Sequence, residues 1–213
     1  MSEQPPIDFW FDFASPYGYL MSEKIDALAE RHGRRVRWRP VLLFAVLRAL
    51  DLPAPMAHEA KRAYMWHDFE RSARFLGVPL RLPAGFPTIA PHAARAFHLV
   101  DRIDSAGAVR FAQAAMRGYF RDAAPLDSAG QVARWACDAV PAVGDAAHFE
   151  RLLAGDEAKG LLRQEVDTAV RERVFGSPFV VIDGEAFFGV DRLPQIDAWL
   201  DGRLSFAEPR RGA

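Results

Sequence analysis

Strand-like segments occur only at the two ends of this 213-residue chain, and the long stretch between them, residues 42–160, shows no strand pattern. That stretch is dominated by Ala, Leu, Arg and Glu, which favour helices. The few strands must therefore come together in one sheet from opposite ends of the sequence. Any fold of this chain interrupts a small sheet with a helical block.

The N-terminal end has the pattern of a strand, a helix and a second strand. The aromatic-rich segment "IDFWFDF" (7–13) favours a strand, and "RRVRWRPVLL" (34–43) alternates as a second strand does. Between them, residues 16–32 have apolar positions near helical spacing. Ser15 is a typical N-cap and Pro16 a typical first helical residue, since Pro lacks an N–H that the first turn leaves unpaired. We therefore predict a βαβ unit.

The C-terminal end has a different pattern, with two strands between two helices. It comprises a helix at 158–174, strands at 177–183 and 185–190, and a closing helix at 191–202. Asp183-Gly184 separates the strands and is a typical hairpin turn. Helices in the middle block are expected at 57–76, 89–105, 107–122, 127–139 and 145–153.

A βαβ half and an αββα half around one sheet follow each other in the order of the thioredoxin fold. We therefore predict an α/β, thioredoxin-like fold with a large all-helical insertion. In this assignment residues 1–41 and 158–213 form the thioredoxin-like domain, and residues 42–157 form the inserted helical domain.

Composition narrows the classes of function. The chain has 27 Lys and Arg residues against 28 Asp and Glu residues, a balance that argues against nucleic acid or an anionic membrane as partner. Its N-terminus lacks a secretory pattern, and no apolar run approaches the roughly 20 residues that span a bilayer. We expect a cytoplasmic protein that acts on a small molecule. The histidines lack metal-ligand spacing, so no metal site is expected.

Cysteine content limits the chemistry further. Cys137 is the single cysteine, so the chain has neither an internal disulfide nor a CxxC pair. Any thiol chemistry must use a thiol from outside. By itself, Ser15 in "FDFASPYGYL" is most simply a helix cap. In a thioredoxin topology, however, it faces the distal "GSP" segment, where its O–H and the helix N-terminus are suited to stabilise a bound thiolate.

Three segments carry a resemblance to a known family. They are "FDFASPYGYL", "AKRAYMWHDFERSARFLGVPL" at 60–80, and "VFGSPFVVIDGEAFFGVDRL" at 174–193. With their order and spacing, the chain resembles the 2-hydroxychromene-2-carboxylate isomerases, glutathione-dependent members of the kappa-class glutathione transferase group. That family has a thioredoxin fold with a helical insertion, like the bacterial disulfide oxidoreductases. The resemblance also suggests a homodimer.

The resemblance implies roles for individual residues. Ser15 matches the serine that contacts the glutathione sulfur, and Ser177-Pro178 matches the usually cis X-Pro pair that binds the cysteinyl backbone. Asp191 and Arg192 match the pair at the glutamyl end, although without the resemblance they are simply a helix cap and a first-turn residue. Lys61 matches a lysine near the glycyl carboxylate.

Other positions concern the second substrate. Tyr64, Phe86 and Ile89 are candidates for a pocket that holds an aromatic substrate, although aromatic residues at helical spacing more often belong to a core. Ile89 stands where the family has an asparagine, and Asp51 or a neighbour replaces a family Gly-Asn. Because of both departures, the resemblance does not fix the identity of the substrate.

Three functions follow as hypotheses. The first is glutathione-dependent interconversion of 2-hydroxychromene-2-carboxylate and trans-o-hydroxybenzylidenepyruvate, a reaction of aromatic-ring catabolism. The second is a kappa-like glutathione transferase or peroxidase that acts on other electrophiles. The third is a non-catalytic binding module with a thioredoxin fold. Disulfide oxidoreductase activity is nearly excluded, because Cys137 has no partner cysteine.

Overall fold

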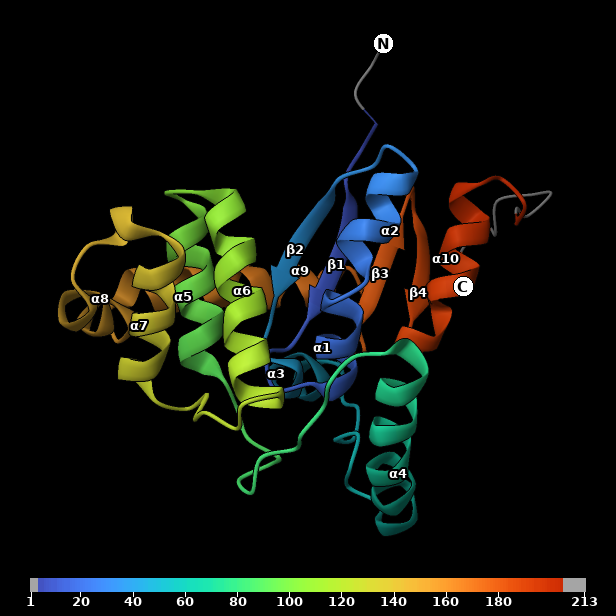
Figure 1. The fold of residues 1–213 in the computed structure, drawn as a ribbon, viewed down its shortest axis with the longest axis horizontal. Helices are drawn as coiled ribbons and strands as arrows, with labels where there is room; N and C mark the ends of the chain where they lie inside the picture. Colours follow the sequence, from blue (N-terminus) through green and yellow to red (C-terminus); the bar gives the residue numbers. More distant parts are fainter. Residues whose placement is uncertain (1–3, 205–213) are drawn as a thin grey trace.

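Strands from both ends of the chain form one four-stranded sheet (Figure 1). The structure, a computed structural model, describes residues 4–204. The strands are β1 (Ile7–Phe11), β2 (Val36–Pro40), β3 (Phe179–Ile182) and β4 (Glu185–Phe188). Their order is β2-β1-β3-β4, with β1 parallel to β2 and antiparallel to β3, and with β3 antiparallel to β4. This arrangement confirms the thioredoxin-like fold predicted from the element order.

The central strand β1 sends apolar side chains into cores on both faces of the sheet. Ile7, Phe9 and Phe11 are fully buried in the larger core, whereas Trp10 belongs to a smaller core on the opposite face together with Phe179. Successive side chains of a strand alternate between faces, so an unbroken apolar run indicates a sheet covered on both sides.

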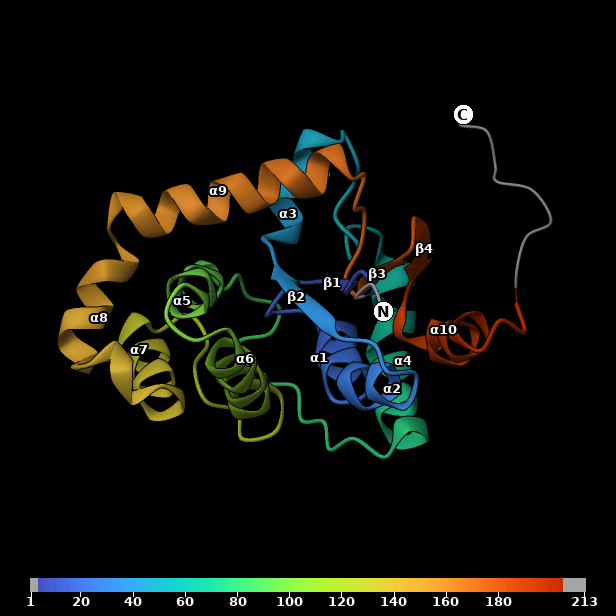
Figure 2. The same cartoon turned by 90° about the horizontal axis from the view of Figure 1, so that it is seen from above.

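Helices cover both faces (Figure 2). One face packs against α1 (Pro16–Ser22), α2 (Ile25–Arg31) and α10 (Leu193–Leu200), and the other against α3 (Leu43–Ala49) and α9 (Asp156–Arg171). A short 3-10 helix, η2 (Val190–Arg192), precedes α10.

The middle of the chain is helical, as predicted. Its helices are α4 (Glu59–Leu76), α5 (Pro91–Asp101), α6 (Ser105–Phe120), α7 (Ala129–Ala139) and α8 (Ala146–Leu153). Helices α5 to α8 pack together beside the sheet, whereas α4 lies apart from them and contacts α1 (Figure 1). Because α9 contacts both α3 and α5, it connects the bundle to the sheet. The division into domains at residues 42 and 157 stays a prediction.

Two local predictions were wrong. The single helix expected over 16–32 is interrupted at Glu23 and Lys24, which separate α1 from α2. The Ser22 hydroxyl donates to the Tyr19 carbonyl at 2.7 Å, an alternative to continued helix, and the Glu23 carboxylate accepts from Arg117 of α6 at 2.8 Å. Helix α3 was not expected. Its seven residues follow a strand directly, and so short an apolar run shows no helical period.

Among residues 4–204, no helix is both long enough and apolar enough to cross a lipid bilayer. Within the same range, no group of His, Cys, Asp or Glu side chains is arranged to hold a metal ion.

Two helical glycines provide a test of the packing between α6 and α7. A Cβ on Gly118 would lie 2.4 Å from the Trp135 ring, whereas a Cβ on Gly160, within α9, meets no atom within 4 Å. We expect Gly118→Ala to lower the free energy of unfolding by about 1–3 kcal/mol through overpacking. The control Gly160→Ala should raise it by about 0.5–1 kcal/mol, because alanine is the better helix former. Urea unfolding measures both, and equal shifts would contradict this packing.

Candidate active site

Ser15 and Ser177 meet at the end of the sheet where β1 leads into α1. The Ser15 Oγ accepts a hydrogen bond from the Gly18 N–H at 3.1 Å, which is the N-cap contact expected from the sequence. The same hydroxyl donates to the Ser177 carbonyl at 3.0 Å, across 162 residues of chain. Ser15 therefore caps a helix and also contacts the distal "GSP" segment.

The segment around Ser177 is closely held. Its peptide bond to Pro178 is cis, as the resemblance implied. The Ser177 Oγ accepts from the Asp12 N–H at 2.9 Å, and the Pro178 carbonyl accepts from the Gly189 N–H at 3.1 Å. A Cβ on Gly18 would lie 2.9 Å from the Ser177 Oγ, so glycine at position 18 permits this close approach.

Asp12 supports the loop beneath both serines, and sequence reasoning missed it. Its carboxylate accepts from the N–H groups of Ala14 and Leu43, both at 2.8 Å, and so connects the loop after β1 to the start of α3. Burial raises the pKa of Asp12, while the two backbone hydrogen bonds act in the opposite direction. An acidic residue directly after a strand and before Ser-Pro was the available signal.

A cavity of about 330 Å³ opens beside Ser177. It lies between the first turn of α1, the helix α4, and the link from β4 through η2. Its lining residues are Tyr17, Asp68, Ser72, Ser177, Phe188, Gly189, Val190, Asp191 and Arg192. Within residues 4–204, no protein group accepts a hydrogen bond from the Ser177 N–H. Ser177 is nevertheless buried, with only 7% of its surface exposed. A buried backbone donor of this kind needs an acceptor from water or a ligand.

Tyr17 and Asp68 form a hydrogen-bonded pair in the cavity wall. The Tyr17 hydroxyl donates to the Asp68 carboxylate at 2.5 Å, and Arg71 also donates to that carboxylate. Burial acts to raise the pKa of Asp68, but the hydrogen bonds from Tyr17 and Arg71 outweigh it and lower that pKa. Burial and the bond to Asp68 raise the pKa of Tyr17, so its hydroxyl stays protonated. Sequence reasoning missed both residues.

The residues predicted to bind glutathione lie in or around this cavity. Ser177, Asp191 and Arg192 line it, and Ser15 and Pro178 adjoin it through the contacts above. Asp191 and Arg192 form an ion pair with each other. Lys61 is exposed on α4, seven residues before Asp68. That spacing places it on the same helix face, about 10 Å farther along the axis.

The three residues proposed for an aromatic substrate are not among those that line this cavity. Tyr64 and Ile89 are exposed, and the Tyr64 hydroxyl donates to Asp68 at 3.3 Å. Phe86 packs against the rings of Trp66 and Phe69, as a core residue does. Their role in a substrate pocket stays a prediction.

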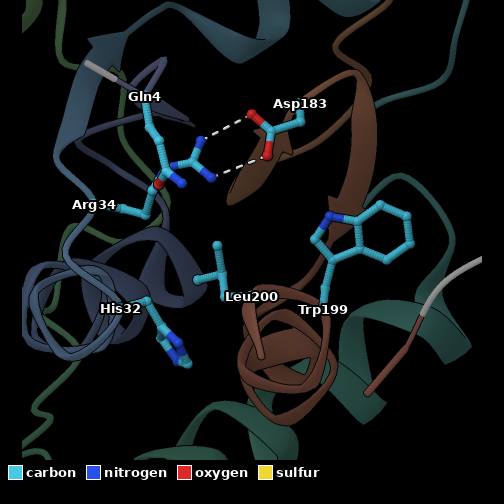
Figure 3. A pocket seen from close by; sticks show the side chains of 6 residues that line it. All are labelled: Gln4, His32, Arg34, Asp183, Trp199 and Leu200. Atoms are coloured by element: carbon cyan, nitrogen blue, oxygen red, sulfur yellow. Dashed lines mark hydrogen bonds and ion pairs between the residues drawn. The ribbon is translucent and has the colours of Figure 1, made fainter. Parts of the chain in front are cut away.

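A second hollow, of about 240 Å³, lies at the opposite end of the sheet, before β2 and after β3. Figure 3 shows the residues that line it. Its most buried charged group, the Arg34 guanidinium, donates to both carboxylate oxygens of Asp183 at 2.9 Å. The His32 ring lies between Asp197 and Asp201, at 3.0 and 3.3 Å. The cavity beside Ser177 is the better candidate, because Ser177, Asp191 and Arg192, which the resemblance predicts to bind glutathione, line it.

Known proteins show the same fold and related sequences. The family model described as a DSBA-like thioredoxin domain matches residues 6–201. A protein of Sphingobium xenophagum named 2-hydroxychromene-2-carboxylate isomerase is 32% identical, over 91% of this chain and 97% of its own. Glutathione s-transferase kappa 2 of Caenorhabditis elegans is 27% identical, over 100% of this chain and 96% of its own.

A solved structure agrees with these sequence matches. A 2-hydroxychromene-2-carboxylate isomerase superposes with a TM-score of 0.80 at 24% identity, covering 93% of this chain and 95% of its own, a likeness that shows the fold. The chain belongs to the DsbA-like thioredoxin domain family, in the group that includes 2-hydroxychromene-2-carboxylate isomerases and kappa-class glutathione transferases.

The Tyr17–Asp68 pair makes part of the stability depend on pH. Because the pKa of Asp68 is lowered on folding, its contribution is complete above its ordinary pKa of about 3.9 and is lost as pH falls through the lower folded value. Removing the Tyr17 hydroxyl in Tyr17→Phe should raise the pKa of Asp68. The variant should therefore be less stable than the wild type at neutral pH, and this deficit should shrink below about pH 4.

Carboxyl titration by NMR and urea unfolding at several pH values check this prediction. Tyr64→Phe is the matched control, because its hydroxyl contacts the same carboxylate at the longer distance of 3.3 Å from an exposed position. The pKa of Asp68 should move less in that variant. Equal shifts in the two variants would contradict the assignment of the main hydrogen bond to Tyr17.

Proposed function

We propose that this chain is a glutathione-dependent isomerase that interconverts 2-hydroxychromene-2-carboxylate and trans-o-hydroxybenzylidenepyruvate. The observation that carries the proposal is the contact between the Ser15 hydroxyl and the Ser177 carbonyl, beside a cavity that contains no cysteine. Cys137 lies on α7, in the helical bundle. The name of the Sphingobium xenophagum relative supports the same reaction type.

The residues around the cavity fit glutathione. The tripeptide carries one ammonium and two carboxylate groups. Asp191 and Arg192 line the cavity, and Lys61 lies on α4. Asp68, the other acidic side chain of the lining, already accepts hydrogen bonds from Tyr17 and Arg71. The Ser177 N–H is available to the cysteinyl carbonyl. Asp191 would hold the ammonium, while Arg192 and Lys61 would hold the carboxylates.

Ser15 would act on the sulfur. A thiol with a pKa near 8.5 is mostly protonated at neutral pH, and a nearby hydrogen-bond donor favours its thiolate form. The chemistry that glutathione would supply here is a thiolate for reversible addition to the conjugated double bond of the ring-opened substrate, which would let that bond rotate before elimination. Serine, unlike cysteine, forms no mixed disulfide, so Ser15 can donate a hydrogen bond to the sulfur and release the cofactor unchanged.

The proposed function predicts a strict requirement for glutathione and for the Ser15 hydroxyl. The purified protein should isomerise the chromene with glutathione and not without it, and Ser15→Ala should lower kcat/KM about 100-fold, by analogy with the loss of one oxyanion donor. Absorbance of the conjugated product measures the rate.

Ser128→Ala is a matched control for the capping role of Ser15. Ser128 caps α7 through the Gln131 N–H at 3.3 Å, in the helical bundle. Its replacement should cost about 1 kcal/mol of stability and leave turnover unchanged. Isomerisation at the same rate without glutathione would refute the proposed mechanism.

A kappa-like glutathione transferase or peroxidase is the second candidate, favoured by the match to the kappa 2 protein over the whole chain. Conjugation of an aromatic halide, or reduction of a peroxide, in the absence of chromene isomerisation would support it. Absence of glutathione binding in calorimetry at millimolar concentration would instead support a non-catalytic binding module. The homodimer and the cytoplasmic location remain predictions.

A further inference from the structure

The Ser15 hydroxyl has one proton, and in this structure that proton already forms a hydrogen bond within the protein. The hydroxyl donates to the Ser177 carbonyl at 3.0 Å, while its oxygen accepts from the Gly18 N–H at 3.1 Å. A hydroxyl has a single donor. In this arrangement Ser15 therefore has no proton to offer to a sulfur atom, and a thiol that enters the cavity must first redirect it.

Two hydrogen bonds hold the segment that carries this carbonyl. The Ser177 Oγ accepts from the Asp12 N–H at 2.9 Å, and the next carbonyl, of Pro178, accepts from the Gly189 N–H at 3.1 Å. Ser177 is also 7% exposed and lines the cavity. Rotation of the Ser15 hydroxyl is therefore the simplest way to release the proton.

Ser177 has the hydrogen-bonding groups that pair with one residue of a peptide. Its N–H has no acceptor among residues 4–204, and its carbonyl faces the Ser15 side. Ser177 lies at a bend two residues before the first residue of β3. In an antiparallel pair, one residue can exchange both its N–H and its C=O bond with the residue opposite. A peptidic ligand residue would therefore accept from the Ser177 N–H and donate its own amide N–H to the Ser177 carbonyl.

We propose that the amide N–H of the bound thiol ligand displaces the Ser15 hydroxyl from the Ser177 carbonyl and thereby releases the Ser15 proton to the sulfur. This inference rests on the proposed function, because it takes glutathione as the ligand. The exchange is favourable because a hydrogen bond to a thiolate is charge-assisted, whereas the bond to the carbonyl is between neutral groups. The thiol S–H is the one covalent bond that breaks, and its proton passes to solvent, while Ser15 keeps its O–H and donates it to the sulfur as a hydrogen bond.

A consequence for specificity follows. The site would activate thiols that carry an amide N–H on the carbon next to the CH₂–S group, which are cysteinyl peptides. In a complex with a thiol that lacks this N–H, the Ser15 hydroxyl would still donate its hydrogen bond to the Ser177 carbonyl. The sulfur of such a thiol would therefore not be activated, however tightly the thiol binds. Recognition of the peptide backbone and activation of the thiol would thus be one event.

The test compares glutathione with its ester analogue, in which oxygen replaces the N–H between the glutamyl and cysteinyl residues. Calorimetry measures binding of each ligand, and the ultraviolet absorbance of the thiolate, followed against pH, gives the thiol pKa of each bound ligand. We expect the wild-type chain to lower the thiol pKa of glutathione by about one unit more than that of the ester. In Ser15→Ala this difference should disappear, and in Ser15→Thr, which keeps a hydroxyl, it should persist.

The possible outcomes separate this inference from the proposed function. If glutathione does not bind, the proposed function fails, and this inference fails with it. If both ligands bind and their thiol pKa values fall equally in the wild type, the proposed function stands and the exchange at the Ser177 carbonyl is wrong. A difference that survives in Ser15→Ala would also overturn the inference, since another donor would then be responsible. Circular dichroism confirms that each variant is folded.

Discussion

The antiparallel pairing of β1 with β3 is the interaction on which the rest of the molecule depends. It joins Asp8 with Val181 and Trp10 with Phe179, residues from opposite ends of the chain. Nothing local links these segments, so the apolar side chains on both faces of β1 must provide the free energy that closes so long a loop. Once the register is set, the loop after β1 and the segment before β3 necessarily lie side by side, and Ser15 reaches Ser177.

The chemistry of the site follows from that pairing and from the absence of cysteine at position 15. A hydroxyl there can cap α1, contact the Ser177 carbonyl and donate to a ligand, but its single proton serves only one acceptor at a time. The site is therefore best understood as an exchange of hydrogen bonds. Asp12 holds the loop beneath it through backbone donors from two segments, so that the exchange takes place on a rigid support.

The sequence predicted some site residues and missed others. Ser15, Ser177, Asp191 and Arg192 were predicted through the family resemblance, and the structure places them in or beside one cavity. Their binding roles stay predictions. Tyr17 and Asp68 were missed, since the two lie 51 residues apart and no sequence pattern pairs them. Their contact at 2.5 Å exists only because α4 packs against α1. The break at Glu23 was missed for a similar reason, as its carboxylate binds Arg117 of a distant helix.

The sequence by itself determined the element order, the fold class and the lack of a cysteine pair. These properties depend on local periodicity, on turn residues and on the single Cys137, all of which are visible along the chain. Only the tertiary structure decided which face of α4 borders the cavity and which acceptor holds the Ser15 proton. Those outcomes depend on the packing of segments that are far apart in sequence, and side-chain contacts across such distances leave no periodic signal.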